Sequence, residues 1–158
     1  MQLTRYTDYA LRVLIYLGHE QDGLAKIGDI SGQYGISKNH LMKVVLGLGK
    51  MGYVTTVRGK GGGLKLARPP GAINLGEVVR KTEETLHLVE CLERGYQGGC
   101  LLYPACRLKS VIHEAQSQFF AHLDRYTIAD VLAKRSPFAP LAFHRKTAAK
   151  RQQQPSEV

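Results

Sequence analysis

The chain has 158 residues, of which 44% are hydrophobic and 22% charged, with 22 Lys and Arg against 13 Asp and Glu. This length suits one domain, or a small domain with a dimerisation element, and the composition excludes a fibrous or wholly disordered chain. No apolar run approaches the roughly 18 residues that cross a membrane, and the N-terminus lacks the apolar stretch of a signal peptide. We therefore expect a cytoplasmic protein with no membrane partner.

The formal net charge of +9 is unevenly distributed along the chain. No acidic residue lies between Asp29 and Glu77. Because a solvated surface normally mixes both signs, this window predicts contact with a polyanion, and nucleic acid is a better interpretation than a merely basic surface. The same stretch contains seven basic residues, namely Lys38, Lys43, Lys50, Arg58, Lys60, Lys65 and Arg68.

Residues 3–19 are expected to form the first helix, because apolar residues recur at intervals of three and four. A short helix over residues 26–33 follows, with Ile27 and Ile30 facing inward, and Gly35 supplies the permissive backbone of a tight turn. The apolar stripe of the first helix consists of Leu3, Tyr6, Ala10, Val13, Leu14 and Leu17.

Ser37 is a good N-cap for a third helix that runs to about Met51. Two helices joined by a glycine turn, with the second one capped, are typical of a helix-turn-helix motif. The buried face of the third helix is expected to hold Leu41, Val44, Val45 and Leu48, and the opposite face Asn39, Lys43, Leu46 and Lys50.

Two β-rich segments, 53–57 and 64–66, flank a basic, glycine-rich loop. Directly after a helix-turn-helix, such a hairpin predicts the wing of a winged-helix domain over residues 1–70. The glycines do not make a phosphate-binding loop, because G-x-G-x-x-G fails at Leu64 and G-x-x-x-x-G-K-S/T fails at Val44 and Met51.

Residues 71–135 are expected to form a second region, which carries the cysteines and a dimerisation helix. It begins with a helix over 75–88, entered through Asn74, and continues with an irregular loop over 91–106. A long amphipathic helix from about 105 to 125 follows, and we favour its pairing with a second subunit over packing on its own domain. Thr127 is expected to cap a short helix that ends at Leu132, and residues 136–158 form a disordered basic tail. The fold class is thus mainly α, a winged helix-turn-helix domain with a small β-hairpin wing and a long dimerisation helix.

Three cysteines follow the pattern Cys91-x8-Cys100-x5-Cys106. An odd number does not suit a disulfide framework, and three thiols in one loop favour a shared ligand over isolated buried cysteines. Soft thiolates select zinc, copper(I) or iron–sulfur clusters. The related zinc spacing needs a histidine at Ser110. We therefore favour an iron–sulfur cluster with a fourth ligand that is not cysteine, and the candidates are Asp8, Glu90, His87 and His113.

Several separate motifs carry a family resemblance. They are residues 1–12 (MQLTRYTDYALR), 34–41 (YGISKNHL), 57–63 (VRGKGGG) and 104–109 (PACRLK). Together they resemble the NsrR family, the nitric-oxide-sensing branch of a superfamily of winged-helix iron–sulfur repressors. The resemblance covers residues 1 to about 135. It implies a homodimer that binds a palindromic A·T-rich operator in double-stranded DNA while its cluster is intact, and that releases the operator when nitric oxide attacks the cluster.

The resemblance also implies individual roles. Cys91, Cys100 and Cys106 match the three cluster thiolates, and Asp8 matches an aspartate that completes the cluster from the other subunit. The x8 spacing is longer than in several relatives, so 4Fe-4S and 2Fe-2S clusters both stay open. The sister regulator IscR uses a histidine at the position of Lys109. From the residues alone, Asp8 is rather an ion-pair partner of Arg5 or Arg12.

The expected function is transcriptional repression through DNA binding, relieved by nitric oxide. The alternatives are a regulator of iron–sulfur status of the IscR type and a zinc-stabilised winged-helix protein without a sensing role. The motifs H-E-x-x-H, G-x-S-x-G and C-x-x-C are all missing from the sequence, which argues against an enzyme. The third helix is expected to enter the major groove with Ser37, Lys38, Asn39, His40 and Lys43, while Arg58 and Lys60 of the wing reach the minor groove or its phosphates.

Overall fold

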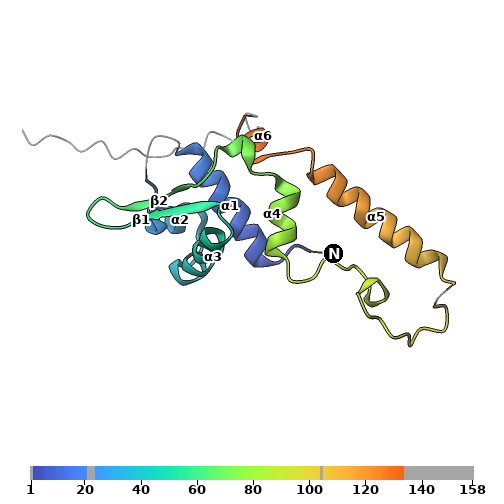
Figure 1. Ribbon diagram of the computed structural model, residues 1–158. Helices are drawn as coiled ribbons and strands as arrows, with labels where there is room; N and C mark the ends of the chain where they lie inside the picture. Colours follow the sequence, from blue (N-terminus) through green and yellow to red (C-terminus); the bar gives the residue numbers. More distant parts are fainter. Residues whose placement is uncertain (1, 21–23, 104, 134–158) are drawn as a thin grey trace, which may run out of the picture.

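Helices dominate the part of the chain that the computed structural model describes, which comprises residues 2–20, 24–103 and 105–133. The α-helices are α1 (Arg5–His19), α2 (Ile27–Tyr34), α3 (Lys38–Lys50), α4 (Leu75–Thr82), α5 (Arg107–Leu123) and α6 (Ile128–Ala133). Two short 3-10 helices, η1 (Pro70–Ala72) and η2 (Glu90–Leu92), and two strands, β1 (Val54–Val57) and β2 (Gly63–Leu66), complete the elements (Figure 1).

Helix α1 is the centre of the fold and packs against α3, α4 and α6. Its buried stripe includes Ala10, Val13, Leu14 and Leu17, as expected from the sequence. The prediction that the helix and its stripe begin at Leu3 was wrong. The Thr4 side chain accepts a hydrogen bond from the backbone N–H of Thr7 and so takes the N-cap position, which leaves Leu3 outside the helix and 37% exposed.

Helices α2 and α3 form the expected helix-turn-helix. Gly35 lies between them with φ of 64°, a left-handed conformation that glycine adopts without strain. The Ser37 hydroxyl accepts a hydrogen bond from the His40 N–H and caps α3. The buried face of α3 is confirmed, since Leu41, Val44, Val45 and Leu48 all lie in the core.

The two strands form the expected wing, an antiparallel hairpin in which Val54 pairs with Leu66 and Val57 with Gly63. Its base is held to the segment before α2, because Ala25 and Leu64 exchange two backbone hydrogen bonds. A Cβ atom at Gly63 would lie 2.7 Å from the carbonyl oxygen of Ala25, so this close approach requires glycine. The mainly α, winged-helix fold class is therefore confirmed.

Helix α4 corrects the expectation of a helix over 75–88, because it ends at Thr82. Asn74 caps its start as predicted, through a hydrogen bond from the Glu77 N–H. Two features end it early. Glu83 and Glu84 would add negative charge to the negative end of the helix dipole, and the Thr82 hydroxyl donates back to the carbonyl of Val78.

The long helix α5 and the short helix α6 are both present, and their ends lie within two residues of the expected ones. The Asp130 carboxylate accepts hydrogen bonds from the N–H and hydroxyl of Thr127, at the start of α6. The hydrophobic core includes Ile73, Val78 and Ile128 and so extends beyond the expected boundary at residue 70. The predicted tail, 136–158, lies outside the described residues. Within those residues, no helix is both long and apolar enough to cross a bilayer.

Candidate nucleic-acid interface and cysteine segment

The solvent face of α3 carries the side chains expected to read DNA. Lys38, Asn39 and Lys43 are exposed on it. Two others also serve the fold, because the Ser37 hydroxyl caps α3 and the His40 ring packs at 6.3 Å from the ring of Tyr9 on α1. The helix therefore presents an ordered row of polar and basic groups to solvent.

Sequence reasoning did not assign Met42 to this face. Its side chain is 50% exposed, and Leu46 beside it is 63% exposed. Met42 lies three residues after Asn39, so helical spacing was the signal that places it on the same side. Two exposed apolar side chains among basic ones suit a surface that meets both phosphates and thymine methyl groups.

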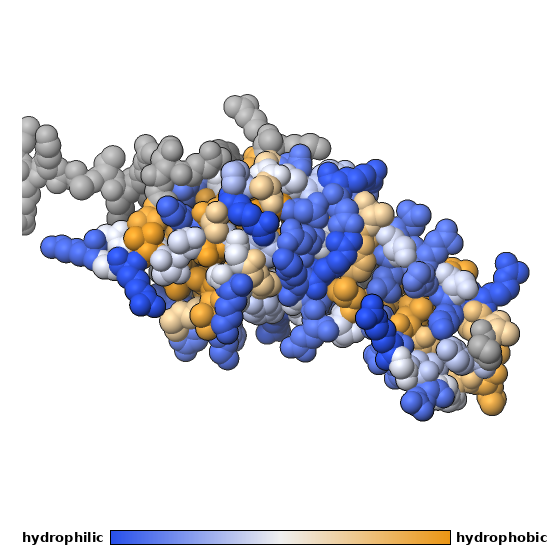
Figure 2. All heavy atoms as spheres, viewed as in Figure 1, coloured by the Kyte–Doolittle hydropathy of each residue, from blue (hydrophilic) through white to orange (hydrophobic). Residues whose placement is uncertain are grey.

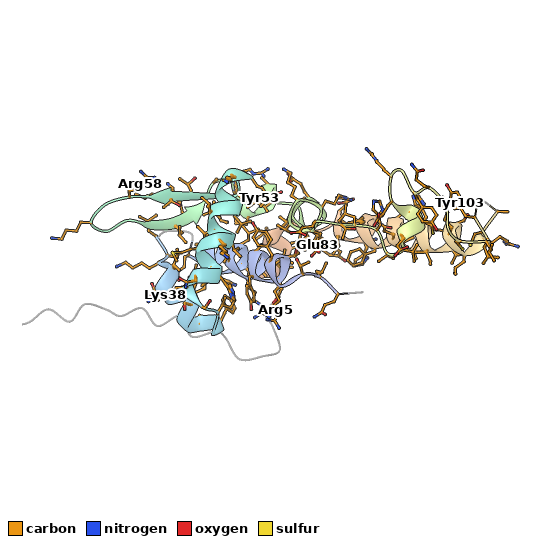
Figure 3. All side chains as sticks on the ribbon, turned by 90° about the horizontal axis from the view of Figure 1, so that it is seen from below. Arg5, Lys38, Tyr53, Arg58, Glu83 and Tyr103 are labelled. Carbon is orange, nitrogen blue, oxygen red and sulfur yellow. The ribbon has the colours of Figure 1, made fainter. Side chains whose placement is uncertain are left out.

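The wing presents Arg58 and Lys60 at the tip of its hairpin, and both are exposed. The tip bends at Gly59 and Gly61, whose φ values are 104° and 89°, and it is closed by a hydrogen bond from the Gly62 N–H to the Gly59 carbonyl. Figure 3 shows Arg58 and Lys38 at the same end of the molecule, far from Tyr103 at the other end. The structure thus places the two predicted basic elements together.

The base of the wing is fastened to α4 by charged and aromatic groups. The Arg68 guanidinium lies 4.7 Å from the centre of the buried Tyr53 ring and 3.8 Å from the Glu77 carboxylate. Lys81 donates a 2.7 Å hydrogen bond to the same carboxylate, and this bond is the main cause of the lowered pKa of Glu77. Burial raises the pKa of the Tyr53 hydroxyl. These contacts hold the wing at a set angle to the rest of the domain.

Residues 83–106, called here the cysteine segment, connect α4 to α5. Its three thiols form no disulfide, and Cys91 and Cys106 are half-buried while Cys100 is exposed. The turn that carries Cys100 is closed by a hydrogen bond from the Tyr103 N–H to the Cys100 carbonyl, and the rings of Tyr96 and Tyr103 pack edge to face at 5.2 Å. The segment is therefore a shaped loop that presents free thiols.

Two residues in the first turn of α5, Cys106 and Lys109, differ in their suitability as ligands of a cluster. Cys106 is the N-cap residue of α5, a position where the helix dipole favours a negatively charged ligand. The ammonium group of Lys109, three residues after Cys106, lies 4.5 Å from the centre of the Tyr103 ring. This cation–π contact holds a group that is not a metal ligand at that position.

The described residues of one chain contain no cluster of three or more His, Cys, Asp and Glu side chains close enough to hold a metal ion. The candidate fourth ligands Glu90, His87 and His113 are all exposed. Asp8 instead forms an ion pair with Arg12, in which two of the guanidinium nitrogens lie 3.0 and 2.9 Å from its carboxylate oxygens. One chain by itself does not bring Asp8 and the three thiols together.

The donor chemistry of the cysteine segment nevertheless fits an iron–sulfur cluster. Three unpaired thiols lie on one loop, and thiolates are the ligands that such clusters prefer. Gly95, Gly98 and Gly99 have φ of 85°, 88° and 152°, so the loop follows a path that bulkier residues would strain. The residues present thus suit the group.

The outer half of the molecule exposes apolar surface. Helix α5 contains no buried residue, and Leu108 and Val111 on it are 61% and 60% exposed. Leu101 and Leu102 at the tip of the cysteine segment are also exposed, and Figure 2 shows hydrophobic surface at this end of the molecule. A cavity of about 590 Å³ lies between the start of α1, the end of α4 and α5.

Comparison with known proteins places the whole described chain in one family. Residues 3–134 match the Rrf2 family, described as an iron-dependent transcriptional regulator. The chain is 49% identical over 142 residues to the HTH-type transcriptional regulator NsrR of Bacillus subtilis (strain 168), covering 89% of this chain and 97% of that protein. It is 47% identical over 147 residues to NsrR of Geobacillus kaustophilus (strain HTA426), covering 92% and 99% respectively.

Two solved structures have the same fold. CymR (YrzC), the global cysteine regulator of B. subtilis, superposes with a TM-score of 0.70 at 23% identity and covers 86% of this chain and 99% of its own. T. potens IscR superposes with a TM-score of 0.65 at 26% identity, over 84% of this chain and 86% of its own.

Proposed function

The chain belongs to the Rrf2 family of transcriptional regulators, and from this premise we propose that it is a nitric-oxide-responsive repressor carrying an iron–sulfur cluster. As a member of that family it is a DNA-binding regulator and not an enzyme. The observation that carries the proposal is the presence of three unpaired thiols, Cys91, Cys100 and Cys106, on one shaped loop. The similarity to regulators named NsrR supports nitric oxide as the signal.

Operator binding is proposed to use α3 and the wing together. Lys38, Asn39 and Lys43 face solvent on α3 and enter the major groove, with Ser37 and His40 at the start of the helix. Arg58 and Lys60 contact the adjacent minor groove or its phosphates, because narrow A·T-rich grooves attract basic side chains. The contacts of Arg68 with Tyr53 and Glu77 keep the wing at the required angle.

The active form is proposed to be a homodimer in the cytoplasm, bound to a palindromic operator. Helix α5 exposes Leu108 and Val111 to solvent in one chain, and a helix with no buried residue needs a partner to cover its apolar stripe. A twofold dimer presents two copies of α3 to two half-sites of the operator.

Asp8 is proposed to complete the ligand set from the other subunit. Its carboxylate is paired with Arg12 at 2.9 Å, and both side chains are about two-fifths exposed, so the ion pair is weak and easily exchanged. When bound, the cluster supplies iron that reacts with nitric oxide, and a carboxylate is a harder, weaker ligand for that iron than a thiolate. An Asp8 carboxylate released from the iron would pair again with Arg12, and α1 would no longer be tied to the partner's cysteine segment.

The test is anaerobic purification followed by visible absorption and native mass spectrometry before and after addition of nitric oxide. We expect a coloured dimer with one cluster per chain, and loss of operator binding once nitric oxide has reacted. A colourless protein that contains zinc would replace the proposal with the zinc-stabilised alternative. A cluster that controls operator binding but does not respond to nitric oxide would favour a regulator of iron–sulfur status, as in IscR.

A further inference from the structure

The end of α4 meets the start of α1 through buried hydroxyl groups. The Thr7 hydroxyl donates a 2.9 Å hydrogen bond to the Thr82 hydroxyl, and the two residues are 0% and 5% exposed. Thr82 in turn donates to the carbonyl of Val78 within α4. Because a buried hydroxyl that loses its partner costs free energy, this pair holds the two helix ends in one relative position.

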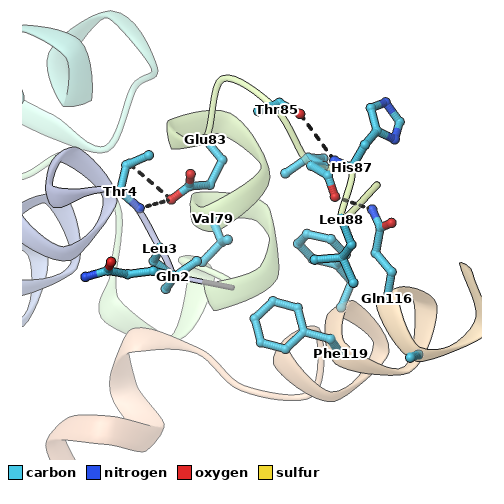
Figure 4. A pocket seen from close by; sticks show the side chains of 13 residues that line it. Gln2, Leu3, Thr4, Val79, Glu83, Thr85, His87, Leu88, Gln116 and Phe119 are labelled. Atoms are coloured by element: carbon cyan, nitrogen blue, oxygen red, sulfur yellow. Dashed lines mark hydrogen bonds between the residues drawn. The ribbon is translucent and has the colours of Figure 1, made fainter. Parts of the chain in front are cut away.

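Glu83 adds a second connection at the same junction. One of its carboxylate oxygens accepts hydrogen bonds from the Thr4 N–H at 2.8 Å and from the Thr4 hydroxyl at 3.1 Å (Figure 4). Thr4 is the N-cap of α1, so a negative charge lies at the positive end of this helix, where the helix dipole favours it. Glu83 therefore stabilises the first turn of α1 from outside the helix.

The junction of α4 with α1 lies between the cysteine segment and the helix-turn-helix. Glu83 is the first residue of the cysteine segment, eight positions before Cys91. The Asp8 N–H donates to the Thr4 carbonyl, so the residue that Glu83 holds also sets the turn that carries Asp8. On the far side of the cavity, the Gln116 amide of α5 donates to the Leu86 carbonyl and fastens the same segment to α5 (Figure 4).

The first turn of α1 also contacts the DNA-reading helix. Tyr6 lies two residues after Thr4, and a Cβ atom at Gly47 of α3 would overlap its hydroxyl group. Tyr6 is thus packed directly against the backbone of α3, with no side chain between them. A displacement of the start of α1 can therefore reach α3 through a direct packing contact.

We propose that Glu83 is a positioning residue that transmits the state of the cysteine segment to α3, through Thr4, the first turn of α1 and Tyr6. The Thr7–Thr82 pair keeps the junction stiff enough to carry the displacement. This inference rests on the proposed function, because it needs a cluster whose loss changes the conformation of the cysteine segment.

The test compares operator affinity with and without the cluster in four proteins: wild type, Glu83→Ala, Glu83→Gln and Glu84→Ala. For wild type we expect a ratio of roughly 5- to 150-fold between the two forms, the usual range for coupled sites. In Glu83→Ala, we expect the operator affinities with and without the cluster to differ by no more than about twofold. Glu83→Gln should restore the wild-type ratio, because its amide oxygen still accepts from the Thr4 N–H. Glu84 is the matched control, an exposed neighbour with no hydrogen bond or ion pair in the described part of the chain.

The outcomes distinguish a failure of the relay from a failure of the proposed function. A wild-type ratio near one contradicts the proposed function itself. A full wild-type ratio that persists in Glu83→Ala overturns the relay, as does an equal weakening of DNA binding in both forms of that variant, because a purely structural role predicts it.

A second measurement needs no cluster. In cluster-free protein, Glu83→Ala should accelerate amide hydrogen exchange in α3 as well as in the first turns of α1, relative to Glu84→Ala. Thr82→Val, which nearly keeps the buried volume but leaves the Thr7 hydroxyl without its Thr82 acceptor, should do the same. Exchange that changes in α1 alone would show that the connection ends there, and would overturn the proposal.

Discussion

The two ends of the molecule differ in how completely one chain builds them. At one end, α3 and the wing rest on a continuous core, with Leu41, Leu48 and Tyr53 fully buried. At the other end, α5 has no buried residue, and the cysteine segment holds one exposed and two half-buried thiols. Figure 1 shows this difference as a packed helical body from which α5 and the cysteine segment extend.

Under the proposed function, this contrast corresponds to different physical demands on the two ends. A DNA-reading surface works best when it is preformed, because any ordering on binding subtracts from affinity. A sensing site has to change when its signal arrives, so low local stability there is an advantage. The four predictions below test this contrast.

The largest effect is expected from removal of single cysteines. Cys91→Ala, Cys100→Ala and Cys106→Ala should each abolish the visible absorption of the cluster and its control of operator binding. The fold should survive, because none of these thiols lies in the hydrophobic core. Absorption and circular dichroism of anaerobic protein give the two readouts. A variant that keeps a full cluster identifies a cysteine that is not a ligand.

Removal of basic side chains from α3 and the wing should leave the visible spectrum of the cluster unchanged. Arg58→Ala is expected to cost about 1–3 kcal/mol of operator binding, and Lys43→Ala to lower the salt slope of binding by about one. Arg94→Ala, in the exposed cysteine segment, is the matched control and should change neither. Titrations at several salt concentrations check this, and unchanged affinity in both test variants would contradict the proposed DNA-reading surface.

The variant Asp8→Ala tests whether Asp8, on α1, is the fourth ligand of the cluster. Because its ion pair with Arg12 is about two-fifths exposed, stability should fall by at most about 1 kcal/mol. The visible spectrum and the rate of reaction with nitric oxide should nevertheless change. Arg12→Ala breaks the same ion pair but keeps the carboxylate, so its spectrum should match wild type. Identical spectra for Asp8→Ala and wild type would return the fourth ligand to Glu90, His87 or His113.

The smallest effect is expected at the junction of α4 and α5. The Arg80 guanidinium donates to both carboxylate oxygens of Asp124 and lowers the pKa of that carboxyl. Because the pKa is lower in the folded state, the ionised carboxylate contributes to the free energy of unfolding above its ordinary pKa of about 3.9. This contribution is lost as the pH falls through the lowered pKa. Asp124→Asn should therefore flatten the acid limb of stability against pH, measured by denaturant unfolding. A parallel shift at all pH values would contradict this assignment.

Much of the helix-turn-helix and the wing was predictable from the sequence, because the sequence patterns that mark them are local. Ser37 and Gly35 mark a cap and a turn through their own backbone preferences, and Leu41, Val44 and Leu48 repeat at helical spacing. The basic residues could be assigned to one surface because the window contains no acidic ones. The exposure of Met42 was not predicted, although its spacing from Asn39 places both on one side of α3. Methionine is usually buried, so its residue type alone favours a core position.

The sequence by itself determined the order of the elements, the helix-turn-helix, the wing and the loop that holds three free thiols. The ion pair of Asp8 with Arg12 was also among the partners expected from the residues alone. Only the tertiary structure decided that Thr7 bonds to Thr82 and that Glu83 holds the N-cap of α1. The physical reason is sequence distance. A cap or an apolar stripe depends on residues within a few positions, whereas Glu83 and Thr4 are 79 positions apart and meet only once the core has brought α4 against α1.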